Sequence, residues 1–206
     1  FGYYFNQDVS NLPHSLTHLT FGHFFNQDVI SLPPFITHLT FGSYFNRDVS
    51  VLPQRITHLI FGYIFDQDVI SLPPFLTHLT FGSCFNQDVS ILPPLLTNLT
   101  FGNYFNQDVT SLPPFITHLS FGFYFNQQYL IPPNIKYLKL NCNNSYIINS
   151  LPNSVAELVL GMNFNLEIND LPTSIKILRI HKNNNYNMDL NCLPDFIEEL
   201  HLSINY

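Results

Sequence analysis

Residues 1–20 read FGYYFNQDVSNLPHSLTHLT, and the same pattern begins again at residue 21. Near-identical copies follow without a break through residue 120, and another Phe-Gly-x-x-Phe-Asn-Gln start stands at Phe121. A fixed period of about 20 to 50 residues is typical of a solenoid, in which each repeat forms one coil of a continuous array. No residue of such an array is unique by default. We therefore expect function on an extended face or at positions where the copies differ.

One short segment of each unit has the pattern of a β-strand. In the copy that runs from Leu32 to Val49, residues 36–41 read ITHLTF and have the Leu-x-x-Leu-x-Leu spacing of a leucine-rich repeat, with Phe in the last position. Leu39 and Phe41 alternate with polar residues, which indicates a half-buried strand. The prolines before this segment exclude a regular helix there. The sequence therefore predicts a mainly β, leucine-rich-repeat-like solenoid with one short parallel strand per 20-residue unit.

About ten such units are expected, in two regions of one solenoid. Residues 1–127 hold the regular repeats, whereas in residues 128–206 the spacing between strand leucines drifts through 19, 20, 20 and 22 residues. Degenerate end repeats often act as caps, so we expect a C-terminal cap in the second region, with the Asn-rich segment 183–185 as part of it. The expected strand centres are Leu19, Leu39, Leu59, Leu79, Leu99, Leu119, Leu138, Leu158, Leu178 and Leu200.

The composition excludes several classes of function. Charged residues make up 10% of the chain and the net charge is −7, with no basic stripe for nucleic acid or an anionic membrane. No apolar run approaches the length of a membrane-spanning helix, and no signal peptide is visible. The three cysteines, Cys84, Cys142 and Cys192, form no disulfide framework, which favours a reducing, intracellular location. The chain begins within a repeat and without Met, so we expect it to be a fragment.

The repeat resembles the FNIP repeat, a leucine-rich-repeat relative found mainly in slime moulds and giant DNA viruses. Phe-Gly-x-x-Phe-Asn-Gln at residues 21–27 and Leu-Pro-x-x-x-Thr-His-Leu at residues 32–39 carry the resemblance, which covers residues 1–127 strongly and the remainder weakly. The Asp at positions such as Asp28 departs from the family, which often has Pro there. In giant viruses such arrays often follow an F-box, so the resemblance implies substrate recognition for a ubiquitin ligase as one alternative.

An invariant Phe ladder and a nearly invariant Asn ladder indicate a structural spine. The Phe ladder is expected to stack in the core, and the Asn ladder to satisfy itself or the turn backbone of the next unit by hydrogen bonds. Asp66 replaces Asn once and has no amide donor, so we expect a weaker rung there and a stabilising effect of Asp66→Asn. The spine residues are Phe5, Phe25, Phe45, Phe65, Phe85, Phe105 and Phe125, with Asn6, Asn26, Asn46, Asn86, Asn106 and Asn126.

A ladder of histidines on the outward side of the predicted strands is the sharpest candidate for chemistry. Side chains one strand apart lie roughly 5 Å from each other, so a metal site, a pH-responsive surface and a plain recognition face all stay open. A straight row of His converges poorly on one metal ion, and no Cys or carboxylate joins it. The Thr row beside it also has the spacing of an ice-binding array, although the interposed His residues break its flatness.

Two further sets complete the candidates. The Asp row that includes Asp8 and Asp48 is expected to cap turns, with calcium binding as the alternative. Outward positions of the degenerate units are charged or aromatic, which favours a partner contact there. The candidate interaction face comprises His18, His38, His58, His78, His118, Thr20, Thr40, Thr80, Thr100, Tyr137, Lys139, Glu157, Arg179 and Glu199.

No catalytic constellation, cofactor motif or phosphate-binding loop stands out from the repeat. The sequence therefore predicts a non-enzymatic scaffold that binds a protein partner through its strand face and needs no cofactor or metal. One alternative is the F-box-linked array described above. The other is a structural protein that self-assembles into fibres or coats through exposed solenoid ends.

Overall fold

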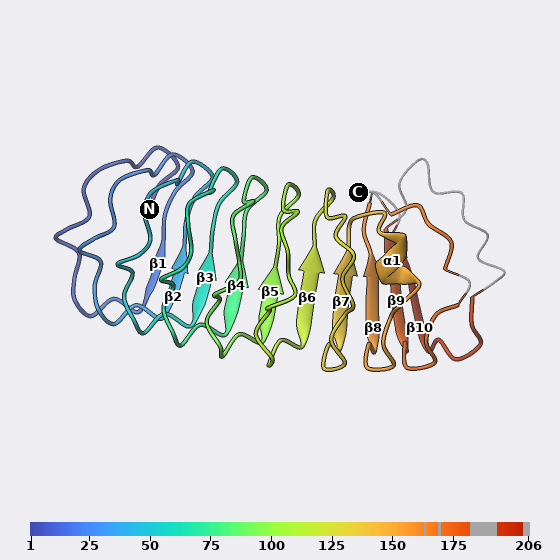
Figure 1. Ribbon diagram of the computed structural model, residues 1–206. Coiled ribbons are helices and arrows are strands. Elements are labelled where there is room, and N and C mark those ends of the chain that lie inside the picture. Colours follow the sequence, from blue (N-terminus) through green and yellow to red (C-terminus); the bar gives the residue numbers. More distant parts are fainter. Residues whose placement is uncertain (163, 169, 182–192, 204–206) are drawn as a thin grey trace.

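The computed structural model shows a solenoid with its strands side by side in chain order (Figure 1). The structure describes residues 1–162, 164–168, 170–181 and 193–203. One ten-stranded sheet, ordered β1 to β10, pairs every strand in parallel with the next. The prediction of a mainly β, leucine-rich-repeat-like solenoid is confirmed. The strands pair in register, so residues that occupy the same repeat position form straight columns across the sheet.

The strands of the regular region are short and contain the predicted leucines. Leu39 and its equivalents point into the core, while the residues on either side face outward. Strand length is three residues through β5, since the Phe-Gly turn follows at once. These strands are β1 His18–Thr20, β2 His38–Thr40, β3 His58–Ile60, β4 His78–Thr80, β5 Asn98–Thr100 and β6 His118–Phe121.

The strands of the second region are longer, with four or five residues each. They are β7 Tyr137–Leu140, β8 Glu157–Leu160, β9 Ile177–His181 and β10 Glu199–Ser203. A short helix, α1 Ser145–Ile148, lies between β7 and β8 and has no counterpart in the regular units; the sequence did not predict it. The Asn144 side chain caps it by accepting a hydrogen bond from the Ile147 N–H. No helix among the described residues is long and apolar enough to cross a membrane.

Two columns of phenylalanine rings fill the core of the regular region. Within a coil the two rings stack closely, as Phe61 and Phe65 do with centroids 3.7 Å apart. From coil to coil the spacing is wider, at 6.1 Å between Phe65 and Phe85. Phe25 through Phe125 in the spine are almost fully buried, while Phe5 at the N-terminal end is partly buried. The predicted Phe spine therefore lies where the sequence placed it.

The invariant glycine after the first Phe marks the closest approach between coils. A Cβ atom added to Gly62 would overlap the carbonyl oxygen of Gly42, and the same overlap recurs at each glycine from Gly22 to Gly122. A Cβ atom added to Gly2, in the first described coil, meets no atom within 4 Å. The glycine column is therefore required by the stacking of backbone on backbone, and not by the turn alone.

Both ends of the described array leave core positions partly uncovered. Phe1 is 47% exposed, whereas Phe21, its equivalent one coil later, is 3% exposed. Leu200 and Leu202 in β10 are 44% and 48% exposed, whereas their neighbours in β9 are buried. The C-terminal cap therefore stays a prediction, and residues 183–185, which were expected to contribute to it, lie outside the described residues. The division into regions 1–127 and 128–206 likewise stays a prediction.

Candidate interaction face

The strand face of the regular region carries a stacked column of imidazole rings. His18, His38, His58 and His78 occupy equivalent positions on β1 to β4, and their parallel pairing aligns the side chains. The ring centroids are 4.3, 4.2 and 4.1 Å apart, with interplanar angles of 12 to 13°. Asn98 takes the next position on β5, and His118 follows on β6. We call this set the imidazole column.

Each ring of the column is held by the threonine that precedes it. Thr37 Oγ1 lies 2.9 Å from His38 Nδ1, and the same distance recurs at His18, His58, His78 and His118. The same threonine hydroxyls also reach back to the carbonyl oxygen of the preceding coil, as from Thr37 to Thr17 at 3.1 Å. The Thr row at position 17 of each repeat therefore orients the imidazoles.

Burial and mutual proximity lower the pKa of three histidines of the column. Loss of hydration lowers the pKa of His38, His58 and His78, and neighbouring histidines lower these pKa values further by charge repulsion. The three rings are consequently neutral near pH 7. Protonation at acid pH would place like charges against one another along the sheet.

The geometry of the column is unsuited to holding one metal ion. Parallel stacked rings direct their free nitrogens side by side, whereas a tetrahedral site needs ligands that converge. Among the described residues, no group of three or more His, Cys, Asp or Glu is placed to hold a metal ion. The next outward column, Thr20, Thr40, Ile60, Thr80 and Thr100, adds hydroxyl and apolar groups but no charge.

The strand face changes chemistry in the second region. Tyr137 continues the imidazole column and stacks on His118 with centroids 5.5 Å apart. Arg179 Nε and Glu157 Oε1 form an ion pair at 2.6 Å, and His201 lies 3.0 Å from Glu199 on β10. Burial, with Glu157 next in effect, raises the pKa of Tyr137. Lys139 faces outward on β7 beside them. The structure thus brings together the predicted face residues as two adjoining surfaces, one uncharged and one charged.

The Asn ladder works differently from the expectation. Asn46 Oδ1 accepts a hydrogen bond from the backbone N–H of residue 66 at 2.9 Å, so the side-chain oxygen, and not the amide N–H₂, links the coils. Asp66 Oδ1 accepts from the Asn86 N–H at 2.8 Å in the same way. We expected a weaker contact between coils at Asp66 because Asp lacks an amide donor. That reason is wrong, because the contact uses a side-chain oxygen as acceptor, and a carboxylate oxygen accepts this hydrogen bond as an amide oxygen does. The ladder is also half-buried to exposed rather than a buried column.

The Asp row caps turns, as the sequence predicted. Asp48 accepts hydrogen bonds from both the backbone N–H and the hydroxyl of Ser50, and Asp8 and Asp88 do the same with Ser10 and Ser90. These hydrogen bonds lower the pKa of the three carboxyls. The carboxylate oxygens of these three residues are engaged within their own turns, as at least one is at Asp68 and Asp108, which gives these positions a structural explanation.

Two exposed apolar features of the regular units were not predicted as sites. A flank of aromatic rings follows the Phe-Gly turn, where Phe24 stacks between Tyr4 at 5.5 Å and Tyr44 at 5.0 Å. On the turns farther along each coil, Ile30 and Phe75 are 74% and 56% exposed, and similar residues flank them. The signal in the sequence is an aromatic residue four places into most units, interrupted by Ile64 and Cys84, and an aliphatic residue shortly after Asp-Val in the second to fifth units. The stacked rings of the flank cover each other's faces, which leaves mainly their edges exposed.

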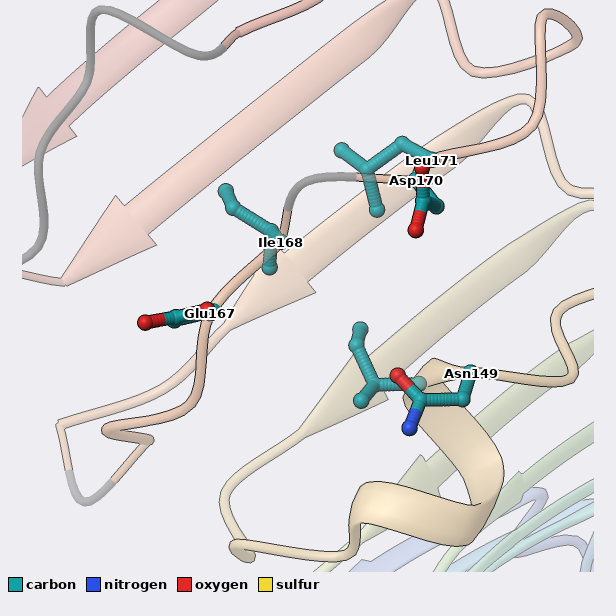
Figure 2. A pocket seen from close by; sticks show the side chains of 6 residues that line it. Asn149, Glu167, Ile168, Asp170 and Leu171 are labelled. Atoms are coloured by element: carbon teal, nitrogen blue, oxygen red, sulfur yellow. The ribbon is translucent and has the colours of Figure 1, made fainter.

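A shallow hollow beside α1 is lined mainly by polar groups. Asn149, Glu167, Ile168, Asp170 and Leu171 line it together with Ile148 (Figure 2). Figure 2 shows that the Glu167 side chain points away from Asp170 and Asn149. The two carboxylates therefore do not converge on a shared ligand, and we assign no site there.

Comparisons with known proteins agree with this geometry. The family model described as FNIP Repeat matches seven overlapping stretches, at residues 25–64, 48–84, 65–104, 85–124, 105–142, 125–163 and 162–204. A solved structure described as CroV588, a novel circular LRR protein structure, from a giant virus, is 42% identical to this chain with a TM-score of 0.77. The alignment covers 96% of this chain and 32% of that one, so the chain spans about a third of its structural relative. None of the curated proteins matches the chain.

Proposed function

The chain belongs to the FNIP repeat family, and from that premise we propose that it is a non-enzymatic scaffold that binds a protein partner through its strand face. The observation that carries this proposal is the continuous outward face of ten parallel strands, whose His and Thr side chains stay partly exposed from β1 to β5. Repetition supplies a long surface of uniform chemistry followed by a charged end, which suits recognition of an extended partner. An intracellular site of action fits the sparse cysteines, of which the described Cys84 and Cys142 are free.

A matched pair of variants tests the strand face. Thr40→Glu with Thr80→Glu adds two charges on the strand face, and Ser31→Glu with Ser71→Glu adds two charges to exposed turns of the same coils. Affinity purification from host cells with each protein should recover a partner with the wild type and the turn variant, and lose it with the face variant. Equal recovery by all three proteins, or equal loss in both variants, would overturn the proposal. Co-purification of ubiquitin-ligase subunits with the full-length protein would support the F-box-linked alternative.

A second candidate function is assembly through the solenoid ends. Inside the array neighbouring coils exchange backbone hydrogen bonds in both directions, as from Thr37 N to the preceding Thr17 O at 2.8 Å and from Phe21 N to the following Thr40 O at 2.9 Å. The outer edges of β1 and β10 each offer backbone N–H and C=O groups for the same parallel pairing, beside partly exposed core residues. Such ends are complementary head to tail, which closes a ring or propagates a filament. The relationship to a circular repeat protein favours the ring.

The oligomeric state tests assembly through the ends. We expect the chain to form head-to-tail oligomers in analytical ultracentrifugation, and Leu200→Lys with Leu202→Lys to abolish them by placing charge on the apolar end. Ile30→Lys with Ile70→Lys, on exposed turns away from both ends, is the matched control. A strictly monomeric wild-type protein at every concentration would exclude self-association of this segment.

A further inference from the structure

The hydrogen bonds of the threonine hydroxyls indicate which ring nitrogen of each neutral histidine carries the proton. Thr37 Oγ1 contacts both the Thr17 carbonyl oxygen, at 3.1 Å, and His38 Nδ1, at 2.9 Å. A hydroxyl has one proton, and a carbonyl oxygen can only accept. Both contacts are satisfied when the hydroxyl donates to the carbonyl and accepts from an N–H at Nδ1. Nε2, at the outer end of the ring, is then the unprotonated nitrogen of the neutral imidazole. The same pair of contacts recurs at His58, His78 and His118.

Asn98 fits the same scheme. The structure places its Oδ1 atom 2.8 Å from Thr97 Oγ1, and that hydroxyl also contacts the Thr77 carbonyl oxygen at 3.1 Å. The hydroxyl has one proton and cannot donate to both oxygens, whereas exchanging the oxygen and nitrogen of the amide satisfies both contacts. We infer this exchanged orientation, in which Nδ2 donates to Thr97 and Oδ1 faces outward. The column therefore presents one outward acceptor atom at the Asn98 position as well.

The resulting row of acceptors has the spacing that one ammonium group can bridge. Neighbouring rings are 4.1 to 4.3 Å apart and nearly parallel, so their Nε2 atoms have a similar separation. An ammonium nitrogen at about 2.9 Å from two such atoms would see them at an angle of roughly 95°, close to the tetrahedral angle between its own N–H bonds. The outward strand positions from β1 to β6 carry no Lys or Arg, and residues 1–120 hold seven acidic and two basic residues.

We propose that the imidazole column binds lysine side chains of a protein partner, each ammonium bridging neighbouring rungs, and that acid releases the partner. This inference rests on the proposed binding role of the strand face and names its partner chemistry and regulation. When Nε2 takes up a proton it stops being an acceptor and becomes a charged donor, while Nδ1–H keeps its bond to the threonine. The column then repels the cation that it bound when neutral.

The surroundings of the column favour a graded response. The groups that face these rings are the other histidines, the uncharged residues Thr and Ile60 beside them, and Tyr137, which stacks on His118 at the far end. The charged pair of Glu157 and Arg179 follows on β8 and β9. Adjacent imidazolium ions repel at the observed ring spacing, so alternate rungs should charge first and the transition should span a broad pH range.

Two substitution sets separate the acceptor from the titration. His38→Asn, His58→Asn and His78→Asn copy the natural Asn98 rung, so they keep an outward oxygen but cannot titrate. His38→Phe, His58→Phe and His78→Phe keep stacked rings but have no acceptor. The probe is a synthetic peptide that alternates Lys and Ser, and its matched control carries acetylated lysines. Long-range ¹H–¹⁵N NMR of the histidine rings reports the tautomer directly and follows binding of the probe.

The proposal makes distinct predictions for each protein. We expect the wild type to show Nδ1–H tautomers, to bind the lysine peptide near pH 7.5, and to lose affinity by on the order of tenfold near pH 5.5, about 1.4 kcal/mol. The Asn variant should bind at both pH values, and the Phe variant at neither. Nε2–H tautomers, equal binding of the acetylated peptide, or unchanged acid release in the Asn variant would each overturn the proposal. A natural partner that maps to the strand face without lysine dependence would overturn this inference alone and leave the scaffold role intact.

Discussion

The regular and degenerate regions form one sheet by different means. Coils in residues 1–127 repeat one set of contacts, with Phe on Phe, Gly against Gly, and Asn oxygen to backbone N–H. In residues 128–206 unlike residues take over: Asn143 Oδ1 accepts from the Asn165 N–H at 2.6 Å, and Asn144 Nδ2 donates to the Gln127 carbonyl at 2.8 Å. Strands there are longer, which adds backbone pairing. The solenoid therefore needs each inter-coil contact to be made, but does not need it to be made by the same residue.

The two regions also differ in what their strand faces offer. The outward strand positions of the regular face carry no Lys, Arg, Asp or Glu and repeat a single acceptor, whereas the second face combines an ion pair, a tyrosine and a lysine. A uniform face suits a repetitive or sliding contact, and a mixed face suits one defined contact. The predictions below test how far this comparison extends to stability, starting from the largest expected effect.

The largest difference should come from the aromatic core. Phe65→Ala removes a fully buried ring that stacks on Phe61 and lies between Phe45 and Phe85. We expect it to lower the free energy of unfolding by about 3–5 kcal/mol. Phe164→Ala, at the equivalent turn beside Gly161, should cost toward the lower end of that range, because no phenylalanine ring stack is described for Phe164. Urea unfolding of both variants checks this, and equal losses would show that ring stacking adds nothing.

Glycine substitution should also separate the regions. Gly62→Ala forces a Cβ atom into the backbone carbonyl of Gly42, whereas Gly161→Ala meets the side chain of Asn141, which can rotate away. We expect a loss of about 1–3 kcal/mol or more for Gly62→Ala and a clearly smaller one for Gly161→Ala. Gly2→Ala is the control with open space. Thermal unfolding midpoints give the ranking, and a Gly62→Ala protein as stable as Gly2→Ala would contradict it.

The Asn contacts should differ by burial. Asn86→Ala removes the acceptor for the part-buried Asn106 N–H, at an expected cost of about 1–3 kcal/mol. Asn143→Ala removes an equivalent contact from an exposed residue, where water can replace it, and should cost less. Asp66→Asn should leave stability within about 0.5 kcal/mol, since the same oxygen accepts the same bond. A large stabilisation by Asp66→Asn, measured by urea unfolding, would restore the idea of an amide-specific ladder.

The ion pair that distinguishes the second face should contribute little to stability. Glu157 and Arg179 are both partly solvent-exposed, so Glu157→Gln should change the free energy of unfolding by about 0–1 kcal/mol. Thr80→Gln is a matched outward substitution in the regular region. Calorimetry of both variants at low and high salt checks this. A salt-dependent loss well above that range would mean that the charged face is structural rather than a contact surface.

The smallest effect should be a region-specific sensitivity to acid. Because the pKa values of His38, His58 and His78 are lowered in the folded chain, the unfolded chain binds more protons below about pH 6.5. Stability should therefore be constant above that pH and decline as the pH falls through the lowered values. The triple His→Asn variant should flatten this part of the profile when thermal midpoints are measured across pH. An unchanged profile would assign the acid sensitivity to other groups.

Much of this arrangement was predictable from the repeat alone. The 20-residue period and the alternation around Leu39 predicted the strand of each coil, and all ten expected leucines lie within strands. The outward position of the histidines followed from the same alternation. Helix α1 was not predictable in this way, because it begins at an Asn cap in a segment without a helical apolar stripe. The aromatic flank was also missed, because its position in the repeat is not invariant and Ile64 and Cys84 interrupt the aromatic residues.

The sequence by itself determined the coil, its strand and the columns that identical positions must form, because a fixed period repeats every local interaction at a fixed offset. Only the tertiary structure decided how those columns work. Stacking brings the Thr37 hydroxyl between a carbonyl of one coil and an imidazole of its own, and it sets the ring spacing near 4.2 Å. It also shows that the Asn ladder uses its oxygen, so that Asp66 fits. These choices depend on distances between coils, which a one-dimensional pattern does not contain.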